Sequence, residues 1–267
     1  MSKLLSQSTA PDDRGRIQCI DPVSACWEYV GFEVFRLKAG ANLEDETGGT
    51  EVCLVLLSGK ADIATANEAW RNLGERSSVF DRQAPYAVYL PPDQRFGVVA
   101  HTDVELAVCK APAKGEYPAR LIRPEDCQFE TRGRGTNRRH VRNILFGNAN
   151  AERLLVCEVL TPGGNWSSYP PHKHDDDRGS EETQLEEIYY HRIDPPQGFA
   201  FQRVYTDDRS LDETMTVTDD DVVMVPEGYH PVGAPHGYDL YYLNVMAGPQ
   251  RKWLFHNDPD HEWIIGS

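Results

Sequence analysis

The sequence predicts an all-β protein of the barrel or sandwich class, on three observations. Short apolar runs rich in Val, Leu, Tyr and Phe recur along the chain, as is typical of strands. The 21 glycines and 18 prolines punctuate these runs and fit many tight turns. The 3.6-residue periodicity of amphipathic helices is weak. The runs expected to be strands are residues 51–58, 87–90, 105–109, 154–160, 199–205, 221–225 and 238–246.

A faint internal repeat indicates that these strands belong to two similar units. Residues 50–56 (TEVCLVL) resemble residues 186–190 (EEIYY). Further downstream of each, residues 87–95 (AVYLPPDQR) resemble residues 222–230 (VVMVPEGYH). Both members of the second pair are a strand that ends in proline and is followed by a turn, so the chain contains a duplicated β unit.

The repeat predicts two domains, an N-terminal unit of residues 1–130 and a C-terminal unit of residues 131–267. The connection lies near residues 113–137, which include Pro118, Pro124, Gly133 and Gly135. The two units differ, because Arg95 stands where the C-terminal unit has His230, and no histidine pair precedes the first repeat. We therefore expect a histidine metal site in the C-terminal unit and no metal in the N-terminal unit.

The C-terminal unit carries a set of side chains suited to one metal ion. His172 and His174 are two positions apart, so on a strand both side chains point to the same face. Glu187 opens the next strand-like run, and His230 follows a Pro-Glu-Gly-Tyr turn. Three imidazoles and a carboxylate suit one divalent transition-metal ion, Zn, Mn, Fe, Co or Ni, with open positions for substrate. The alternative is that the two histidines are exposed loop residues beside the acidic run 175–177.

Composition narrows the class of partner. The net charge of −15 argues against nucleic acid and against an anionic membrane surface, whereas a few local arginines suffice for a small anion. No run approaches the roughly 20 apolar residues of a membrane span, and residues 1–16 lack the apolar stretch of a secretory signal. The six scattered cysteines fit free thiols in a reducing compartment, so we expect a cytoplasmic protein. A homo-oligomer is left open.

The order of the metal motifs resembles the cupins. The chain departs from the usual cupin motifs in two ways: the stretch between His174 and Glu187 is long, and the second motif is one residue short between Gly228 and His230. Both departures resemble those of one bicupin family. This is the family of 5-deoxy-glucuronate isomerases of myo-inositol breakdown, which is related to the uronate ketol-isomerases of pectin degradation. Further stretches that resemble it are residues 132–141, 198–206, 227–232, 238–244 and 258–263.

The resemblance runs over nearly the whole chain and implies two jelly-roll β-barrels and a metal-assisted isomerase. The implied reaction converts 5-deoxy-D-glucuronate to 2-deoxy-5-keto-D-gluconate. A metal that holds the carbonyl and hydroxyl oxygens stabilises the developing enediolate, an effect of several kcal/mol. A base must also move one proton between adjacent carbons. Tyr241 and Glu186 are the candidates for that role, with Tyr229 and the non-ligand His191 as alternatives.

The implied substrate carries a carboxylate, which a guanidinium matches with two parallel hydrogen bonds. Arg139 and Arg203 lie inside family-like stretches and are the candidates for this contact. Each has the alternative of a structural salt bridge. Arg138, Arg142 and Arg251 are weaker candidates.

Three other functions compete with the isomerase. A cupin dioxygenase would consume oxygen, whereas isomerisation needs no oxidant. A non-catalytic sugar-acid-binding regulator would carry a helical DNA-binding module and a basic surface, and the sequence predicts neither. A storage-type structural bicupin conflicts with the intact ligand set.

Overall fold

The computed structural model describes residues 2–266, and nearly all of its regular structure is β-strand. Helix in this part of the chain is limited to α1 (Pro22–Ala25) and the 3₁₀ turns η1 (Pro124–Asp126), η2 (Gly135–Asn137) and η3 (Glu262–Gly266). The all-β prediction is confirmed. The seven expected runs form β5 (Thr50–Ser58), β8 (Ala87–Leu90), β10 (Val104–Pro112), β14 (Leu155–Thr161), β18 (Ala200–Tyr205), β20 (Val222–Val225) and β22 (Asp239–Ala247).

The described residues divide into two structural units. The first unit contains residues 8–128 and 143–157, and the second contains residues 2–7, 129–142 and 158–266. The chain thus leaves the first unit after residue 128 and returns to it for one further segment. The division into two cupin domains at residue 130 stays a prediction.

The first unit has a six-stranded and a four-stranded sheet. The order of the larger sheet is β11-β8-β5-β10-β3-β2, and that of the smaller sheet is β4-β9-β6-β7. Apolar side chains, among them Phe35, Leu54, Leu56, Val88 and Leu106, form one buried cluster in this unit. Its remaining strands are β2 (Arg16–Ile20), β3 (Gly31–Leu37), β4 (Asn42–Glu46), β6 (Ala61–Thr65), β7 (Ala69–Leu73), β9 (Arg95–Ala100) and β11 (Arg120–Ile122).

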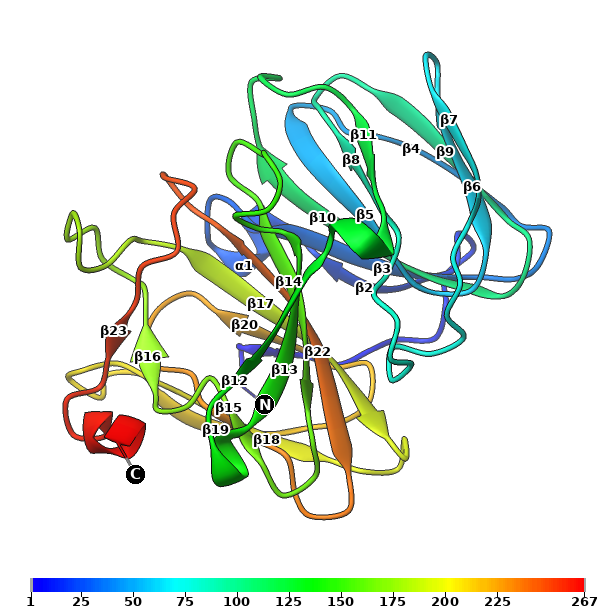
Figure 1. Cartoon of the computed structure of the whole chain (residues 1–267). Helices are drawn as coiled ribbons and strands as arrows, with labels where there is room; N and C mark the ends of the chain where they lie inside the picture. Colours follow the sequence, from blue (N-terminus) through cyan, green and yellow to red (C-terminus); the bar gives the residue numbers. More distant parts are fainter. Residues whose placement is uncertain (1, 267) are drawn as a thin grey trace. The chain divides into compact units, whose positions relative to one another are not determined.

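The second unit contains most of a seven-stranded sheet of order β1-β20-β17-β22-β14-β13-β12 and a four-stranded sheet of order β15-β21-β18-β19. A separate two-stranded ladder pairs β16 with β23, and Figure 1 shows it beside the C-terminal turn η3. The strands not yet located are β1 (Leu5–Ser6), β12 (Gln128–Arg132), β13 (Arg139–Leu145), β15 (Trp166–Ser167), β16 (His172–Lys173), β17 (Glu186–Asp194), β19 (Asp212–Val217), β21 (Val232–Gly233) and β23 (His256–Asn257).

Strand β17 lies between β20 and β22 in the larger sheet of the second unit, and Figure 1 shows the three strands side by side. The antiparallel register sets Glu187 opposite Met246, Tyr189 opposite Asn244 and His191 opposite Tyr242. Residues directly opposite each other in an antiparallel ladder share a face, and successive residues alternate between faces. These side chains therefore all lie on one face of the sheet.

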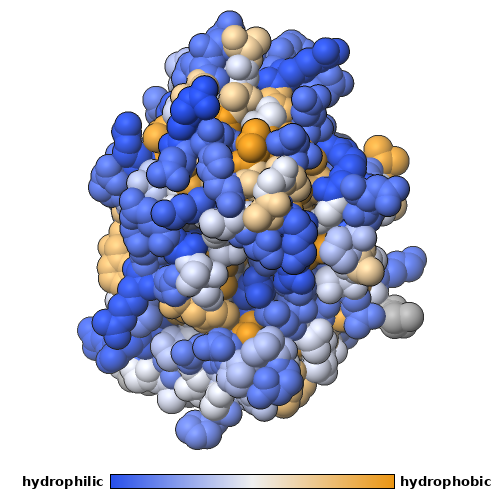
Figure 2. Space-filling model, turned by 90° about the vertical axis from the view of Figure 1, so that its right-hand side faces the viewer, coloured by the Kyte–Doolittle hydropathy of each residue, from blue (hydrophilic) through white to orange (hydrophobic). Residues whose placement is uncertain are grey.

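The surface agrees with the polar composition. Hydrophilic residues cover most of the face in Figure 2, with small hydrophobic areas between them. Within residues 2–266, no helix has the length and apolar character needed to cross a membrane.

Candidate metal centre

The predicted metal ligands come together from three separate segments of the second unit. His172 begins β16, His174 follows it, Glu187 is the second residue of β17, and His230 follows the turn after β20. One nitrogen of each of the three histidines lies within 4.8 Å of the others, and all three side chains are buried. In residues 2–266 this is the one such group of histidine, cysteine or acidic residues. The structure therefore has a three-histidine group that can hold a metal ion.

Glu187 points its carboxylate at the same group. Its Oε2 lies 2.9 Å from Nε2 of His174 and 3.0 Å from Nε2 of His230. Its Oε1 accepts a hydrogen bond from the amide of Asn244, which fixes the carboxylate from the other side. Burial alone would raise the pKa of Glu187, but His230 and His174 outweigh it, so this pKa lies well below its ordinary value. The carboxylate is thus charged and aimed at the histidines.

Backbone carbonyls orient two of the imidazoles. Nδ1 of His174 lies 3.2 Å from the carbonyl oxygen of Leu185, and Nδ1 of His230 lies 2.8 Å from that of Gly228. An Nδ1–H that donates to a carbonyl leaves the Nε2 lone pair facing inward, as metal-binding histidines require. Nε2 of His230 is buried and makes no hydrogen bond of good geometry, although Oε2 of Glu187 lies 3.0 Å away. An orphaned nitrogen beside two imidazoles and a carboxylate fits a divalent ion as its missing partner.

His172 connects the cluster to a cavity of about 700 Å³. Its ring lies 4.9 Å from that of His230 and 4.8 Å from that of Phe255, measured between centroids. Trp253, Phe255 and Ile264 form an apolar part of the cavity wall, whereas residues 130–134 bring mostly polar side chains. The cavity is large enough for a small sugar acid and opens directly onto one proposed ligand.

Arg139 is the predicted substrate arginine that lines this cavity. Its Nη1 donates to the carbonyl oxygens of Asn137 and Tyr169, each at 3.1 Å. In the part of the chain that the structure describes, no carboxylate forms an ion pair with it. Burial lowers the pKa of Arg139, and the nearby phenols of Tyr242 and Tyr189 oppose this effect. A half-buried guanidinium without a protein anion is a ready binding site for a ligand carboxylate.

Arg203, the second predicted substrate arginine, lies elsewhere. It sits on β18 and binds both oxygens of Asp212, at 2.8 Å from Nε and 2.7 Å from Nη2. Its guanidinium also stacks over the ring of Tyr205. Arg203 does not line the cavity with His172. Its donors are occupied by the salt bridge that the sequence left open as the alternative.

The two first candidates for the catalytic base face away from the ligands. Glu186 precedes Glu187 on β17, and Tyr241 precedes Tyr242 on β22, so both point to the opposite face of the sheet. The hydroxyl of Tyr241 donates to Oε2 of buried Glu158 at 2.9 Å, within a salt-bridged network. This placement does not bring Tyr241 or Glu186 to the metal centre.

The other two candidates are also held in separate contacts. The hydroxyl of Tyr229 donates to Asp207 at 2.8 Å. Nε2 of His191 lies 2.9 Å from the side-chain oxygen of Gln202, and burial lowers the pKa of His191 to about 4. His191 is therefore neutral near pH 7, and one of its ring nitrogens is already paired with Gln202.

The sequence did not predict three residues that lie on the same face of the sheet as Glu187. Tyr189 lies two positions after Glu187, and its hydroxyl is 2.9 Å from Oγ of Ser168. Asn244 binds Glu187, and the ring of Tyr242 lies 4.7 Å from that of Tyr189. The alternation along β17 is a signal that finds Tyr189, because residues two apart share a face. Asn244 and Tyr242 require the register between β17 and β22, which no sequence pattern supplied.

The first unit uses the matching positions differently. Glu51, the counterpart of Glu187, is fully buried and accepts three backbone N–H groups of residues 152–154 and the hydroxyl of Tyr89, at 2.7 to 2.8 Å. Arg95, the counterpart of His230, is exposed, with its Nε 3.8 Å from Glu46. In the first unit, Glu51 therefore anchors the loop of residues 152–154 and, among the described residues, is not part of a histidine cluster.

Comparison with known proteins agrees with the fold and the site. Residues 4–264 match the model of the KduI/IolB family. The 5-deoxy-glucuronate isomerase of Geobacillus kaustophilus is 57% identical over all of this chain and 97% of its own, and that of Bacillus subtilis is 52% identical over 89% and 88%. Both relatives carry the name of the family that the sequence motifs resemble.

Solved structures give the same result. An IolB-like protein of Salmonella typhimurium superposes with a TM-score of 0.96 at 53% identity, over 98% of this chain and 99% of that one. Oxalate decarboxylase of Bacillus subtilis, whose Mn(II) centres have been studied, shares the cupin fold alone, with a TM-score of 0.69 at 13% identity over 96% and 80%. The bicupin prediction is confirmed. On the match over residues 4–264 and these identities, the chain belongs to the KduI/IolB family.

Proposed function

We propose that this protein is a 5-deoxy-glucuronate isomerase that forms 2-deoxy-5-keto-D-gluconate in myo-inositol catabolism, and that it acts with one divalent transition-metal ion. The ligands would be His172, His174, Glu187 and His230. The observation that carries the proposal is the buried ligand cluster opening, through His172, onto a cavity that is also lined by Arg139, which has no ion pair with the described carboxylates. The names and identities of the relatives support the substrate.

The residues around the cavity would divide the work of the reaction. A bound divalent ion would supply Lewis acidity to the substrate oxygens that gain negative charge. Arg139 would bind the carboxylate and so hold the other end of the sugar acid in one orientation. The apolar wall of Trp253, Phe255 and Ile264 would exclude water from the bound substrate.

Tyr189 is our proposed proton-handling group. It shares the face of Glu187, its ring centroid lies 5.8 Å from that of His230, and its hydroxyl is paired with Ser168. A phenol so placed can donate a hydrogen bond to a substrate oxygen while that oxygen becomes more basic. The Ser168 hydroxyl would keep the phenol in place and connect it to a second exchangeable proton.

Tyr189→Phe is expected to lower kcat about 10²-fold, because it removes one positioned acid–base group. Tyr241→Phe is the matched control, since both are buried tyrosines on adjacent strands. Tyr241→Phe removes one hydrogen bond to the buried Glu158, so it should lower the melting temperature while kcat changes less than about threefold. Steady-state kinetics and thermal melts of the two variants check this. A larger kcat loss in Tyr241→Phe would return Tyr241 to the catalytic role.

The overall activity is tested directly by NMR. Protein loaded with Mn²⁺ or Zn²⁺ is incubated with 5-deoxy-D-glucuronate, and the aldehyde signal is expected to decline as a ketone signal grows, with no oxygen uptake. The control is the same protein after chelation. Conversion that depends on oxygen would favour a dioxygenase, and the absence of any conversion with bound metal would refute the isomerase.

A cytoplasmic location and a small-molecule partner complete the proposal. The six cysteines are all free thiols, including the buried Cys53, Cys109 and Cys157, which supports a reducing compartment. A free sugar acid of this kind matches the size of the cavity.

A further inference from the structure

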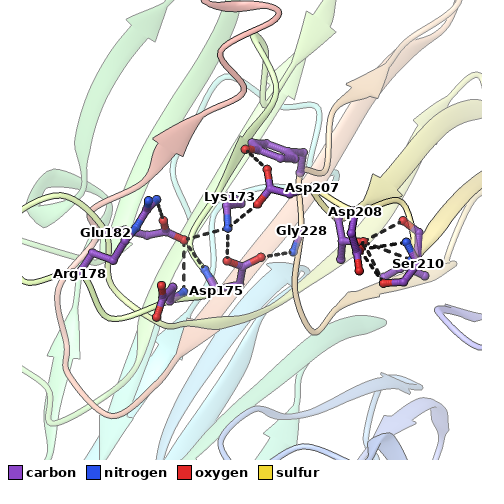
Figure 3. A network of polar contacts seen from close by, with 12 residues as sticks. Lys173, Asp175, Arg178, Glu182, Asp207, Asp208, Ser210 and Gly228 are labelled. Carbon is purple, nitrogen blue, oxygen red and sulfur yellow. Dashed lines mark hydrogen bonds and ion pairs between the residues drawn. The ribbon is translucent and has the colours of Figure 1, made fainter.

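Lys173 stands between two of the proposed ligands and belongs to neither the cavity nor the metal centre. Because it directly follows His172 on strand β16, its side chain points to the opposite side from that of His172. Only 11% of that side chain is exposed. Figure 3 shows its ammonium group among Asp175, Glu182 and Asp207, with dashed contacts to all three.

The first contact of Lys173 leads to the segment that carries His230. Its Nζ lies 2.7 Å from Oδ1 of Asp175, whose side chain is 13% exposed. The other oxygen of Asp175 accepts the backbone N–H of Gly228 at 2.7 Å. Gly228 is two residues before His230 and supplies the carbonyl that orients its ring. One carboxylate therefore joins the strand of the histidine pair to the turn of the third histidine.

The second contact reaches the same turn by another route. Nζ of Lys173 lies 3.1 Å from Oδ2 of Asp207, and Oδ1 of Asp207 accepts the hydroxyl of Tyr229 at 2.8 Å. Tyr229 directly precedes His230. The side chain of Asp207 is 65% exposed, so solvent weakens this arm relative to the buried one through Asp175.

Glu182 stabilises the contact between Lys173 and Asp175 by binding the backbone of Asp175. Its Oε1 accepts the backbone N–H groups of Asp175 at 2.9 Å and Asp176 at 3.2 Å, and its Oε2 binds Arg178. Lys173 lies 3.9 Å from Glu182. Three carboxylates thus surround one ammonium group, and removing that group would leave the buried carboxylates of Asp175 and Glu182 without its charge in a poorly solvated site.

The backbone around His172 and His174 has few pairing contacts, so side-chain contacts must help to hold it. Strand β16 has two residues and pairs only with the two residues of β23. Glu187, in contrast, lies in β17 between two neighbouring strands. The sheet fixes the carboxylate ligand, whereas His172 has only this short ladder, and His174 and His230 lie outside the named strands. Backbone hydrogen bonds from Leu185 to the His174 carbonyl, and between Tyr205 and Tyr229, hold these two segments at single points.

We propose that Lys173, with Asp175 and Asp207, is a positioning clamp that holds the His172–His174 segment and the His230 turn at the spacing the metal requires. The inference rests on the proposed metal centre. It adds a residue that touches neither metal nor substrate and acts on the metal through its neighbours.

The test is metal affinity, measured by competition with a chelator for Zn²⁺ on the full chain. Lys173→Met is expected to weaken Zn²⁺ binding about 10–100-fold, as loss of residues behind metal ligands typically does. Lys173→Arg keeps the charge and should restore most of that loss. Asp175→Asn should cost more affinity than Asp207→Asn, because the Asp175 arm is buried. Melting temperatures of the metal-free variants are measured in parallel.

Lys110→Met in the first unit is the matched control. Lys110 is also largely buried and paired with a buried carboxylate, Glu33, with side-chain exposures of 24% and 9%. Its loss should lower the melting temperature without changing Zn²⁺ affinity. Equal loss of affinity in Lys110→Met and Lys173→Met, or wild-type affinity in Lys173→Met, would overturn the clamp.

Two further outcomes separate the clamp from the metal centre. If Lys173→Met does not fold, Asp175→Asn decides, and unchanged Zn²⁺ affinity in that variant refutes the clamp. If the wild-type protein binds no divalent ion, the metal centre itself is refuted and the clamp with it. If the wild-type protein binds the metal and Lys173→Met binds it with the same affinity, the clamp is refuted and the metal centre stands.

Discussion

The His172→Ala/His174→Ala variant is expected to lose its metal ion and to retain less than about one thousandth of the wild-type kcat/KM. Metal Lewis acidity is worth several kcal/mol, and each 1.36 kcal/mol corresponds to about tenfold in rate. Elemental analysis should find close to one metal ion per chain in the wild type and none in the variant. Circular dichroism should still show a folded β protein, since neither histidine belongs to the central sheet.

Two adjacent glutamates provide a matched control for this result. Glu187→Gln should weaken metal binding strongly, because it removes the charge aimed at His174 and His230. Glu186→Gln changes the same chemical group one residue away, on the opposite face of β17, and should leave metal content unchanged. Full metal content in the double histidine variant, or equal effects of the two glutamine substitutions, would contradict the ligand assignment.

The second large effect is expected at Arg139. Arg139→Lys keeps the positive charge but loses the planar fork that matches a carboxylate. We expect kcat/KM for the sugar acid to fall about 10–100-fold, since hydrogen bonds to charged groups contribute about 1.5–3 kcal/mol. The loss should be smaller for the analogue in which the carboxylate is reduced to an alcohol. The quantity to measure is the acid-to-alcohol ratio of kcat/KM.

Arg203→Lys serves as the control for Arg139→Lys. Arg203 is already bound to Asp212 and lies outside the cavity lining, so its replacement should leave the acid-to-alcohol ratio unchanged. An unchanged ratio in Arg139→Lys would place the carboxylate elsewhere. A changed ratio in Arg203→Lys alone would assign the contact to Arg203.

The features predicted well from the sequence are those that depend on local spacing. Strand runs follow from residue type and turn residues, and all seven expected runs are strands. The pairing of His172 with His174 was also predictable, because an i, i+2 pair on a strand shares a face, whereas the convergence of Glu187 and His230 on that pair was expected from the order of the cupin motifs. Local spacing therefore suffices where one segment supplies the geometry.

The features that the sequence did not predict depend on which face or partner a side chain meets. Tyr189 could have been found from the alternation along β17, but only the register of β17 against β22 places Tyr241, the candidate chosen from the sequence, on the opposite face. Arg139 and Arg203 differ in whether a carboxylate lies nearby, which is set by tertiary packing. Trp253 and Phe255 reach the cavity from a segment without strand or helix periodicity. Such facts come from long-range contacts rather than from motifs.

The interior of the first unit is a place where heat resistance can be evolved without disturbing the chemistry. Stabilising substitutions often cost activity when they fall near a functional site. The cluster around Leu54, Leu56 and Val88 contains none of the proposed ligands or cavity residues. Each methylene that fills a gap there adds about 0.8 kcal/mol at most. Selection for survival at high temperature should therefore accumulate changes in this cluster, and the usual trade-off between robustness and turnover should be weak.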